Sequence, residues 1–226
     1  MDDRLYRYDL GEGVEAFSTM RDAELPYPVL QPHQTHKTNV AVITSTDTTR
    51  EDLQDTDALV CDIPGFAIGV RTADCIPVLM YDPVHRAVGA VHAGWRGTVA
   101  RIAAAAVSKM TEVYGTDPRD LQVQIGPGIG FDSFQVGEEL VERFREEGFP
   151  MEKISRYEDT VTDFPMSGGW HIDLWTANRF VLEEAGIPSE QIRTAGICTY
   201  KRNDLFYSAR RETIACPRII NVIKLK

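Results

Sequence analysis

Short apolar runs, each interrupted by Gly, Pro or Asp, follow one another along the chain from residue 39 to residue 92. The runs are rich in β-branched residues, which favour extended backbone. They predict strands at Asn39–Thr44, Asp57–Cys61, Phe66–Val70, Ile76–Tyr81 and Ala87–His92. Strand signals therefore cluster ahead of the first predicted helix.

Helical patterns begin after these strands. Helices are expected where an Ala-rich or charged stretch carries a capping or stop signal. They are predicted at Thr98–Tyr114, at about Gly137–Glu147, and from the N-cap Asp173 to Glu184. Further strands are predicted at Leu121–Ile125 and, more weakly, at Thr194–Cys198, Leu205–Ser208 and Ile219–Ile223.

The order of these elements indicates the fold class. Strands and helices are intermingled without the regular βαβ alternation of a parallel sheet, so a layered α+β architecture with mixed β-sheets fits better. No repeat or flexible linker divides the chain, and residues 1–226 are predicted to form one domain. The Pro-containing stretch Met151–Gly169 is predicted to be a loop or flap.

The charge balance limits the partners. The chain has 226 residues and a formal net charge of −10. This argues against nucleic acid and anionic membranes, which are usually met by clustered Lys and Arg. A few local arginines could still bind a small anion. No apolar run approaches the ~20 residues of a membrane span.

The cysteines and the N-terminal segment indicate a compartment. The four cysteines, Cys61, Cys75, Cys198 and Cys216, are scattered, and the first ten residues carry charges where a signal peptide would be apolar. Scattered cysteines of this kind are more often buried, catalytic or metal-binding than disulfide-paired. A cytoplasmic location is expected.

Three segments at strand ends carry residues suited to chemistry. They are QTHK (Gln34–Lys37), TADC (Thr72–Cys75) and HAGWRG (His92–Gly97). His36, Cys75 and His92 form a possible His₂Cys ligand set, which suits zinc or copper and leaves a fourth position open. From spacing alone, packing of each residue in the core is the more common explanation.

The HAGWRG segment makes a binding site more plausible. His92 ends an apolar strand, and two glycines flank Trp95 and Arg96 before a helix begins. Glycine allows close backbone approach, and a helix N-terminus favours an anion. The alternative is a plain turn with Trp95 in the core.

Together these segments resemble the laccase-domain family, whose members are described as multicopper polyphenol oxidases or purine nucleoside phosphorylases. The resemblance runs from about Phe17 to the C-terminus. Its motifs are QTH, ADC followed by IPVLMYD, HAGWRG, IGPGI followed by FQV, WHIDLWTAN, ICTY and FYSARR.

The resemblance implies a function and a fold. It implies zinc at His36, Cys75 and His92, in a layered sandwich of mixed β-sheets flanked by helices. The implied activities are phosphorolysis of adenosine, inosine, guanosine and S-methyl-5′-thioadenosine, together with hydrolytic deamination of adenosine. The partners would then be a small nucleoside and phosphate. A neighbouring lineage edits peptidoglycan precursors.

The chain departs from the family pattern in two places. Relatives usually carry an Arg after an F-S/T-T segment and a longer stretch thereafter, whereas here Met20 follows FST and the stretch is short. Arg21 is the candidate replacement for the missing Arg. IACPR (Ile214–Arg218) stands where relatives often have T-G-R.

The number of histidines weighs against true laccase chemistry. The multicopper cluster of a laccase needs several imidazoles beyond one His₂Cys site. The chain has five histidines, and two are already assigned to the metal set. One copper ion is possible at that site, but a multicopper set is not.

The remaining candidates follow from the chemistry that the implied reactions require. Arg71 and Arg96 are the leading phosphate ligands because guanidinium groups bind phosphate in a planar, bidentate way, and Arg210 follows them. Asp74 could move protons in deamination or orient a metal ligand, provided that the backbone bends there. His33 is predicted to line the substrate pocket.

A cysteine hydrolase is the third alternative. Cys75 would then act as a thiolate nucleophile with a histidine base, whereas no sequence feature places a histidine beside Cys198. Removal of metal would separate this reading from the zinc reading.

Overall fold

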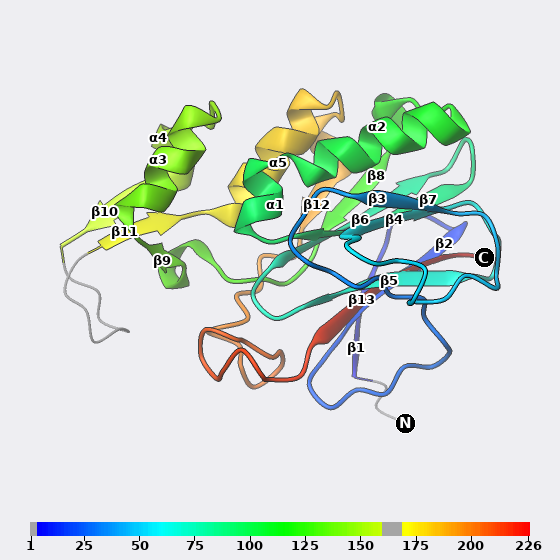
Figure 1. Cartoon of the computed structure of the whole chain (residues 1–226), viewed down its shortest axis with the longest axis horizontal. Coiled ribbons are helices and arrows are strands. Elements are labelled where there is room, and N and C mark those ends of the chain that lie inside the picture. The colour runs from blue at the N-terminus through cyan, green and yellow to red at the C-terminus, as the bar shows by residue number, and fades with distance from the viewer. Residues whose placement is uncertain (1–3, 160–168) are drawn as a thin grey trace.

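Two β-sheets and a layer of helices form the main body of the protein (Figure 1). The computed structural model describes residues 4–159 and 169–226. The larger sheet has six strands in the order β12-β8-β6-β7-β4-β3, with parallel pairs at both edges and antiparallel pairs between them. Its strands are β3 (Val40–Ile43), β4 (Ala58–Cys61), β6 (Ile76–Asp82), β7 (Ala87–Ala93), β8 (Gln122–Ile125) and β12 (Ile192–Thr194).

The second sheet joins the two ends of the chain. Its four strands are antiparallel in the order β1-β2-β13-β5. They are β1 (Leu5–Tyr8), β2 (Val14–Thr19), β5 (Ala67–Thr72) and β13 (Ile219–Leu225). The sheet packs on one face of the six-stranded sheet, and the helices cover the other face.

The alternation of side chains along the strands explains this layering. In β4, Ala58 and Val60 pack in the core beneath the helices. Leu59 and Cys61 pack in a second core, against the four-stranded sheet. Because successive residues of a strand point to opposite faces, a strand that is apolar at every position is buried on both sides.

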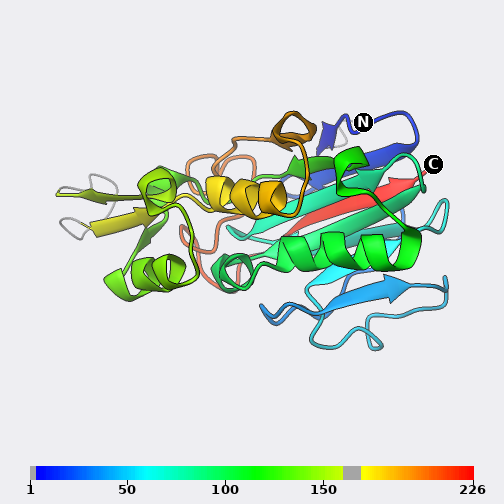
Figure 2. The ribbon, with the colours of Figure 1, turned by 90° about the horizontal axis from the view of Figure 1, so that it is seen from above.

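The helices lie on the outer face of the six-stranded sheet, and a small arm extends from one end of it (Figures 1 and 2). The arm holds a three-stranded sheet, in the order β10-β11-β9, with α3 and α4 beside it. The helices are α1 (Trp95–Val99), α2 (Ile102–Tyr114), α3 (Glu138–Glu146), α4 (Met151–Ile154) and α5 (Leu174–Glu184). The strands of the arm are β9 (Gln135–Val136), β10 (Ser155–Glu158) and β11 (Gly169–Ile172).

The predicted fold class is confirmed: this is a layered α+β sandwich of mixed sheets flanked by helices. Seven predicted strands and the helices after Gly137 and Asp173 form close to the predicted positions. In residues 4–159 and 169–226, no helix combines the length and the apolar character that a membrane span requires.

Several predicted boundaries were wrong. The expected helix Thr98–Tyr114 is two helices, because Arg101 adopts a left-handed conformation with φ of 60° between them. The Arg101 guanidinium lies over the rings of Phe149 and Phe180 and pairs with Glu184, which provides tertiary contacts that local helix propensity does not include.

The strand and loop predictions also failed in several places. Leu205–Ser208 is irregular, and the strand expected at Thr194–Cys198 instead ends at Thr194. The predicted loop Met151–Gly169 contains α4 and β10, and its residues 160–168 lie outside the described part of the chain. The strands β1 and β2 were not predicted.

Candidate metal centre and pocket

A buried carboxylate organises the loop that carries His36. Asp57 is fully buried, and its carboxylate oxygens accept the backbone N–H groups of Thr35 at 3.1 Å, His36 at 2.9 Å and Lys37 at 2.9 Å. His36 itself has a φ of 62°, which is uncommon for a residue other than glycine. The loop is therefore wrapped around Asp57, and its strained conformation is held by these three bonds.

The same carboxylate orients His92. His92 lies near the end of β7 and is 3% exposed, and its Nδ1 donates to Oδ1 of Asp57 over 2.7 Å. This bond fixes the imidazole so that Nε2 faces away from Asp57, an arrangement typical of histidine ligands of metals. Burial alone would raise the pKa of Asp57, but the bonds from His92 and from the loop N–H groups lower it below its usual value.

Cys75 completes the cluster from the turn between β5 and β6. The ligand atoms of His36, Cys75 and His92 all lie within 4.8 Å of one another, and Cys75 Sγ is 3.9 Å from His36 Nε2. Burial alone would raise the pKa of the Cys75 thiol, but the charge of His92 and the hydrogen bond with His36 lower it to about 6. The thiolate is the form of cysteine that binds metals.

These distances and donor types fit a metal ion. Zinc with one sulfur and two nitrogen ligands in tetrahedral geometry holds the donor atoms about 3.5 Å apart. A Cβ atom on Gly94 would lie 3.0 Å from Cys75 Sγ and 3.0 Å from His36 Cδ2, so any larger residue would crowd the cluster. Among the described residues the cluster has three ligands, which leaves a fourth position open.

The cluster lies in the wall of a pocket of about 450 Å³. His33 and Arg71, both proposed from the sequence, line this pocket, as does Gln34. Arg50 and Arg218 also line it, and the sequence analysis missed both. Arg218 belongs to the IACPR segment that departs from the family pattern, whereas no motif surrounds Arg50.

Two of the other predicted residues lie elsewhere. Arg96 is exposed and stacks on the ring of its neighbour Trp95 at 4.2 Å, and it is not part of the described pocket wall. Arg210 lines a separate hollow with Trp95, and its guanidinium donates to the carbonyl of Gln135 over 3.1 Å.

Asp74 faces the C-terminal segment. Its Oδ1 accepts from Thr199 Oγ1 at 2.6 Å, and its Oδ2 accepts from the backbone N–H of Arg210 at 2.7 Å. The backbone does bend here, with φ of 83°, yet Asp74 is not among the described residues that line the pocket. These contacts favour a role in holding the turn that carries Cys75.

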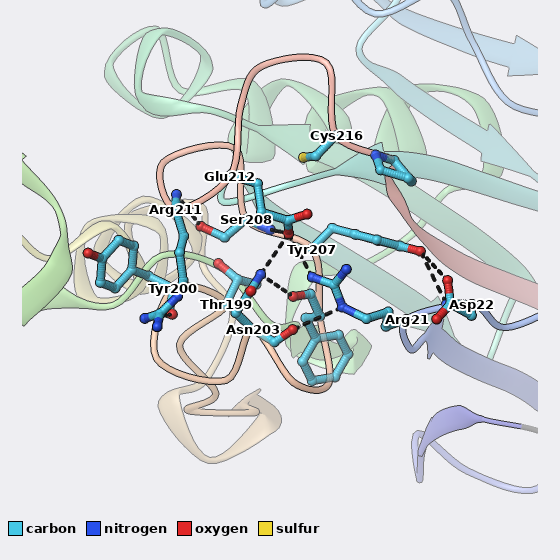
Figure 3. A network of polar contacts seen from close by, with 12 residues as sticks. Arg21, Asp22, Thr199, Tyr200, Asn203, Tyr207, Ser208, Arg211, Glu212 and Cys216 are labelled. Atoms are coloured by element: carbon cyan, nitrogen blue, oxygen red, sulfur yellow. Dashed lines mark hydrogen bonds and ion pairs between the residues drawn. The ribbon is translucent and has the colours of Figure 1, made fainter.

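Arg21 anchors the same C-terminal segment (Figure 3). Its guanidinium pairs with Glu212 at 2.6 Å, donates to the carbonyl of Asn203 over 2.9 Å, and lies 4.2 Å above the ring of Tyr207. The Tyr207 hydroxyl donates to Asp22 over 2.7 Å. Arg21 is absent from the described pocket wall, and its contacts hold this C-terminal segment.

Comparison with known proteins agrees with this architecture. The family model described as multi-copper polyphenol oxidoreductase laccase matches residues 13–226. A purine nucleoside phosphorylase from Bacteroides thetaiotaomicron is 43% identical over 210 residues, which cover 90% of this chain and 75% of that protein. The protein named adenosine deaminase RL5, from an unknown prokaryotic organism, is 41% identical over 189 residues, covering 81% and 70%.

The fold is also found in solved structures. The crystal structure of the Bacillus licheniformis hypothetical protein YfiH superposes with a TM-score of 0.81 at 27% identity, covering 94% of this chain and 93% of that chain. The structure of YlmD from Geobacillus stearothermophilus, at 24% identity, gives a TM-score of 0.82 and covers 97% and 94%.

Proposed function

Since this chain belongs to the multi-copper polyphenol oxidoreductase laccase family, we propose that it is a zinc-dependent purine nucleoside phosphorylase that also deaminates adenosine. The observation that carries the proposal is the His36–Cys75–His92 cluster in the wall of a pocket of nucleoside size. The names of the Bacteroides relative and of the RL5 protein support the same two activities.

His36, Cys75 and His92 would hold the zinc ion. Zinc in an open three-ligand site supplies a Lewis acid and lowers the pKa of water that binds to it. Asp57 keeps His92 in the ligand orientation, and Gly94 leaves room for the cluster. His33 and Gln34, on the same pocket wall, are proposed to contact the nucleoside.

The two reactions share a substrate and differ in the attacking group. In phosphorolysis, a phosphate oxygen bonds to the ribose C1′ while the glycosidic bond breaks, and its electron pair leaves with the base, which takes up a proton. In deamination, water adds at C6 of adenosine and ammonia leaves, which gives inosine. One pocket that orients the nucleoside can therefore serve both reactions.

The oxidase alternative has less support. Among the histidines outside the cluster, His85 bonds to Asp82 through Nδ1 at 3.0 Å, and His171 is fully buried with Nδ1 3.1 Å from the carbonyl of Phe131. Neither lines the described pocket. Only His33 remains near the cluster, so a further copper cluster lacks imidazole ligands.

Metal analysis with product analysis tests the proposal. Protein purified without added metal is expected to contain about one zinc per chain and to convert inosine and phosphate to hypoxanthine and ribose 1-phosphate. His36→Ala and His92→Ala should lose both the metal and the reaction, whereas His85→Ala, a histidine outside the pocket, should keep both.

Two results would refute the proposal. Full phosphorolysis after complete removal of metal by a chelator would refute the role given to zinc. Phenol oxidation by the copper-loaded protein, with no nucleoside turnover by the zinc-loaded protein, would favour the oxidase. We also propose a cytoplasmic location, which the four free cysteines support.

A further inference from the structure

One side of the pocket carries three arginines and no acidic residue. Arg50, Arg71 and Arg218 line it together with the metal cluster, and no Asp or Glu is found among the described lining residues. The chain has 34 acidic residues against 24 basic ones. The arginines of the pocket lining are therefore opposite in charge to the molecule as a whole.

These arginines also lack the acidic partners that several other arginines of the protein have. Arg21 pairs with Glu212, and Arg119 pairs with Asp117. In residues 4–159 and 169–226, by contrast, no carboxylate pairs with any of the three pocket arginines. Their charges remain available to a ligand.

The protein holds two of the three arginines in place. The side-chain amide of Gln34 bonds to both the N–H and the C=O of Arg71, each at 2.8 Å, which fixes the backbone from which the guanidinium projects. Arg218 donates to the carbonyls of Cys216 and Ile214. Burial lowers the pKa of Arg71, and the nearby charges of Arg50 and Arg218 lower it further.

Like charges that approach one another repel, and a doubly charged anion between them removes this repulsion. The planar guanidinium donates two parallel hydrogen bonds to phosphate oxygens, which makes arginine well suited to phosphate recognition. Phosphate is also the group that phosphorolysis must deliver beside the nucleoside.

We propose that Arg50, Arg71 and Arg218 form a phosphate-binding subsite beside the His36–Cys75–His92 cluster. The subsite binds the inorganic phosphate that attacks the nucleoside, and this assignment rests on the proposed phosphorylase function. It replaces Arg96 and Arg210, which lie outside the pocket, as phosphate ligands. Arg71 is the one phosphate ligand that the sequence also indicated.

If this subsite binds the attacking phosphate, its removal should affect phosphorolysis and deamination differently. Phosphorolysis uses phosphate, whereas deamination uses water. Neutral variants of Arg50 and Arg71 should therefore lose phosphorolysis more than deamination. Arg218 is less suited to this test, because its bonds to Cys216 and Ile214 also shape the pocket wall.

The experiment compares Arg50→Gln, Arg71→Gln and the control Arg119→Gln, which alters an exposed arginine outside the pocket lining. Inosine phosphorolysis is measured over a range of phosphate concentrations, and adenosine deamination is measured without phosphate. We expect the KM for phosphate to rise at least tenfold in both pocket variants. In both pocket variants the fold-loss of deamination should be at least five times smaller than the fold-loss of phosphorolysis. The control Arg119→Gln should match the wild type in both activities.

Calorimetric titration with inorganic phosphate separates this proposal from the proposed function. Phosphate binding that is lost in the pocket variants supports the subsite even if the wild type does not cleave inosine, in which case the proposed function alone fails. An unchanged KM and unchanged phosphate binding in both variants would overturn the subsite. Binding of inosine 5′-monophosphate, but not of inorganic phosphate, would overturn its assignment to the co-substrate.

Discussion

The pocket has two walls that are built in different ways. The metal wall consists of strand ends and a tight loop, and a single buried carboxylate, Asp57, bonds to both His92 and the loop of His36. The arginine wall carries Arg50, Arg71 and Arg218, and it comes from irregular segments and from the end of β5. Exposed or half-buried contacts such as Arg21–Glu212 support it. A ligand set for a metal needs rigid geometry, whereas a site for a mobile anion can tolerate some movement.

The largest effect is expected from the centre of the metal wall. Asp57→Ala removes the acceptor of three backbone N–H groups and of His92, and should lower the free energy of unfolding by about 3 kcal/mol. Zinc affinity should fall about 10–100-fold, as for other partners that orient a histidine ligand. Urea unfolding and competition with a zinc chelator measure the two effects.

A neighbouring aspartate provides the matched control. Asp55 contacts the same loop through Thr35 Oγ1 and Lys37 Nζ, but its own side chain is exposed. Asp55→Ala should change stability by less than about 1 kcal/mol and leave zinc affinity unchanged. Equal effects of the two substitutions would contradict the central position given to Asp57.

Gly94 gives a smaller and more specific test of the metal wall. Its φ of −67° suits any residue, so the only obstacle to alanine is the Cβ contact with Cys75 and His36 at 3.0 Å. Gly94→Ala should weaken zinc binding about tenfold, a change of about 1.4 kcal/mol. In Gly137→Ala the added methyl meets only the movable carboxylate of Glu139, and zinc binding should not change.

The difference between the walls also explains what the sequence could predict. His36, Cys75 and His92 stand in short motifs at strand ends, so the cluster that they form could be predicted. Asp57 opens a predicted strand, and nothing local distinguishes it from a solvent-exposed aspartate. Arg50 and Arg218 come from segments that only the tertiary fold brings together, so no spacing in the chain reveals them.

The same reasoning applies to the strands that were missed. In β2, Ser18 and Thr19 are polar yet buried: Ser18 donates to Asn221 of β13 over 2.5 Å, and Thr19 Oγ1 accepts the N–H of Ile220 over 2.8 Å. Asn221 in turn donates to Thr72 of β5 over 2.9 Å. A buried polar ladder across three strands interrupts the apolar pattern, and only the partner strands show why it is stable.

Ile214 tests the arginine wall through its apolar surface. The residue is 80% exposed and lines the pocket, so a bound nucleoside would cover part of its side chain. Ile214→Ala should lose about 1 kcal/mol of nucleoside binding and raise the KM for inosine about fivefold. Stability should remain within about 0.5 kcal/mol of the wild type. An unchanged KM would place the nucleoside away from this residue.

The smallest effect is expected at the anchor of the arginine wall. Arg21→Gln breaks the ion pair with Glu212 and the stacking on Tyr207, both partly exposed, at a cost of about 1 kcal/mol in stability. The wall should become more mobile, and the KM for phosphate should rise two- to threefold while zinc content stays the same. Because Glu212→Gln breaks the same ion pair, the double variant should be little worse than either single variant. A loss of zinc in Arg21→Gln would show that the two walls are coupled, since no contact of Arg21 reaches the metal ligands in the described structure.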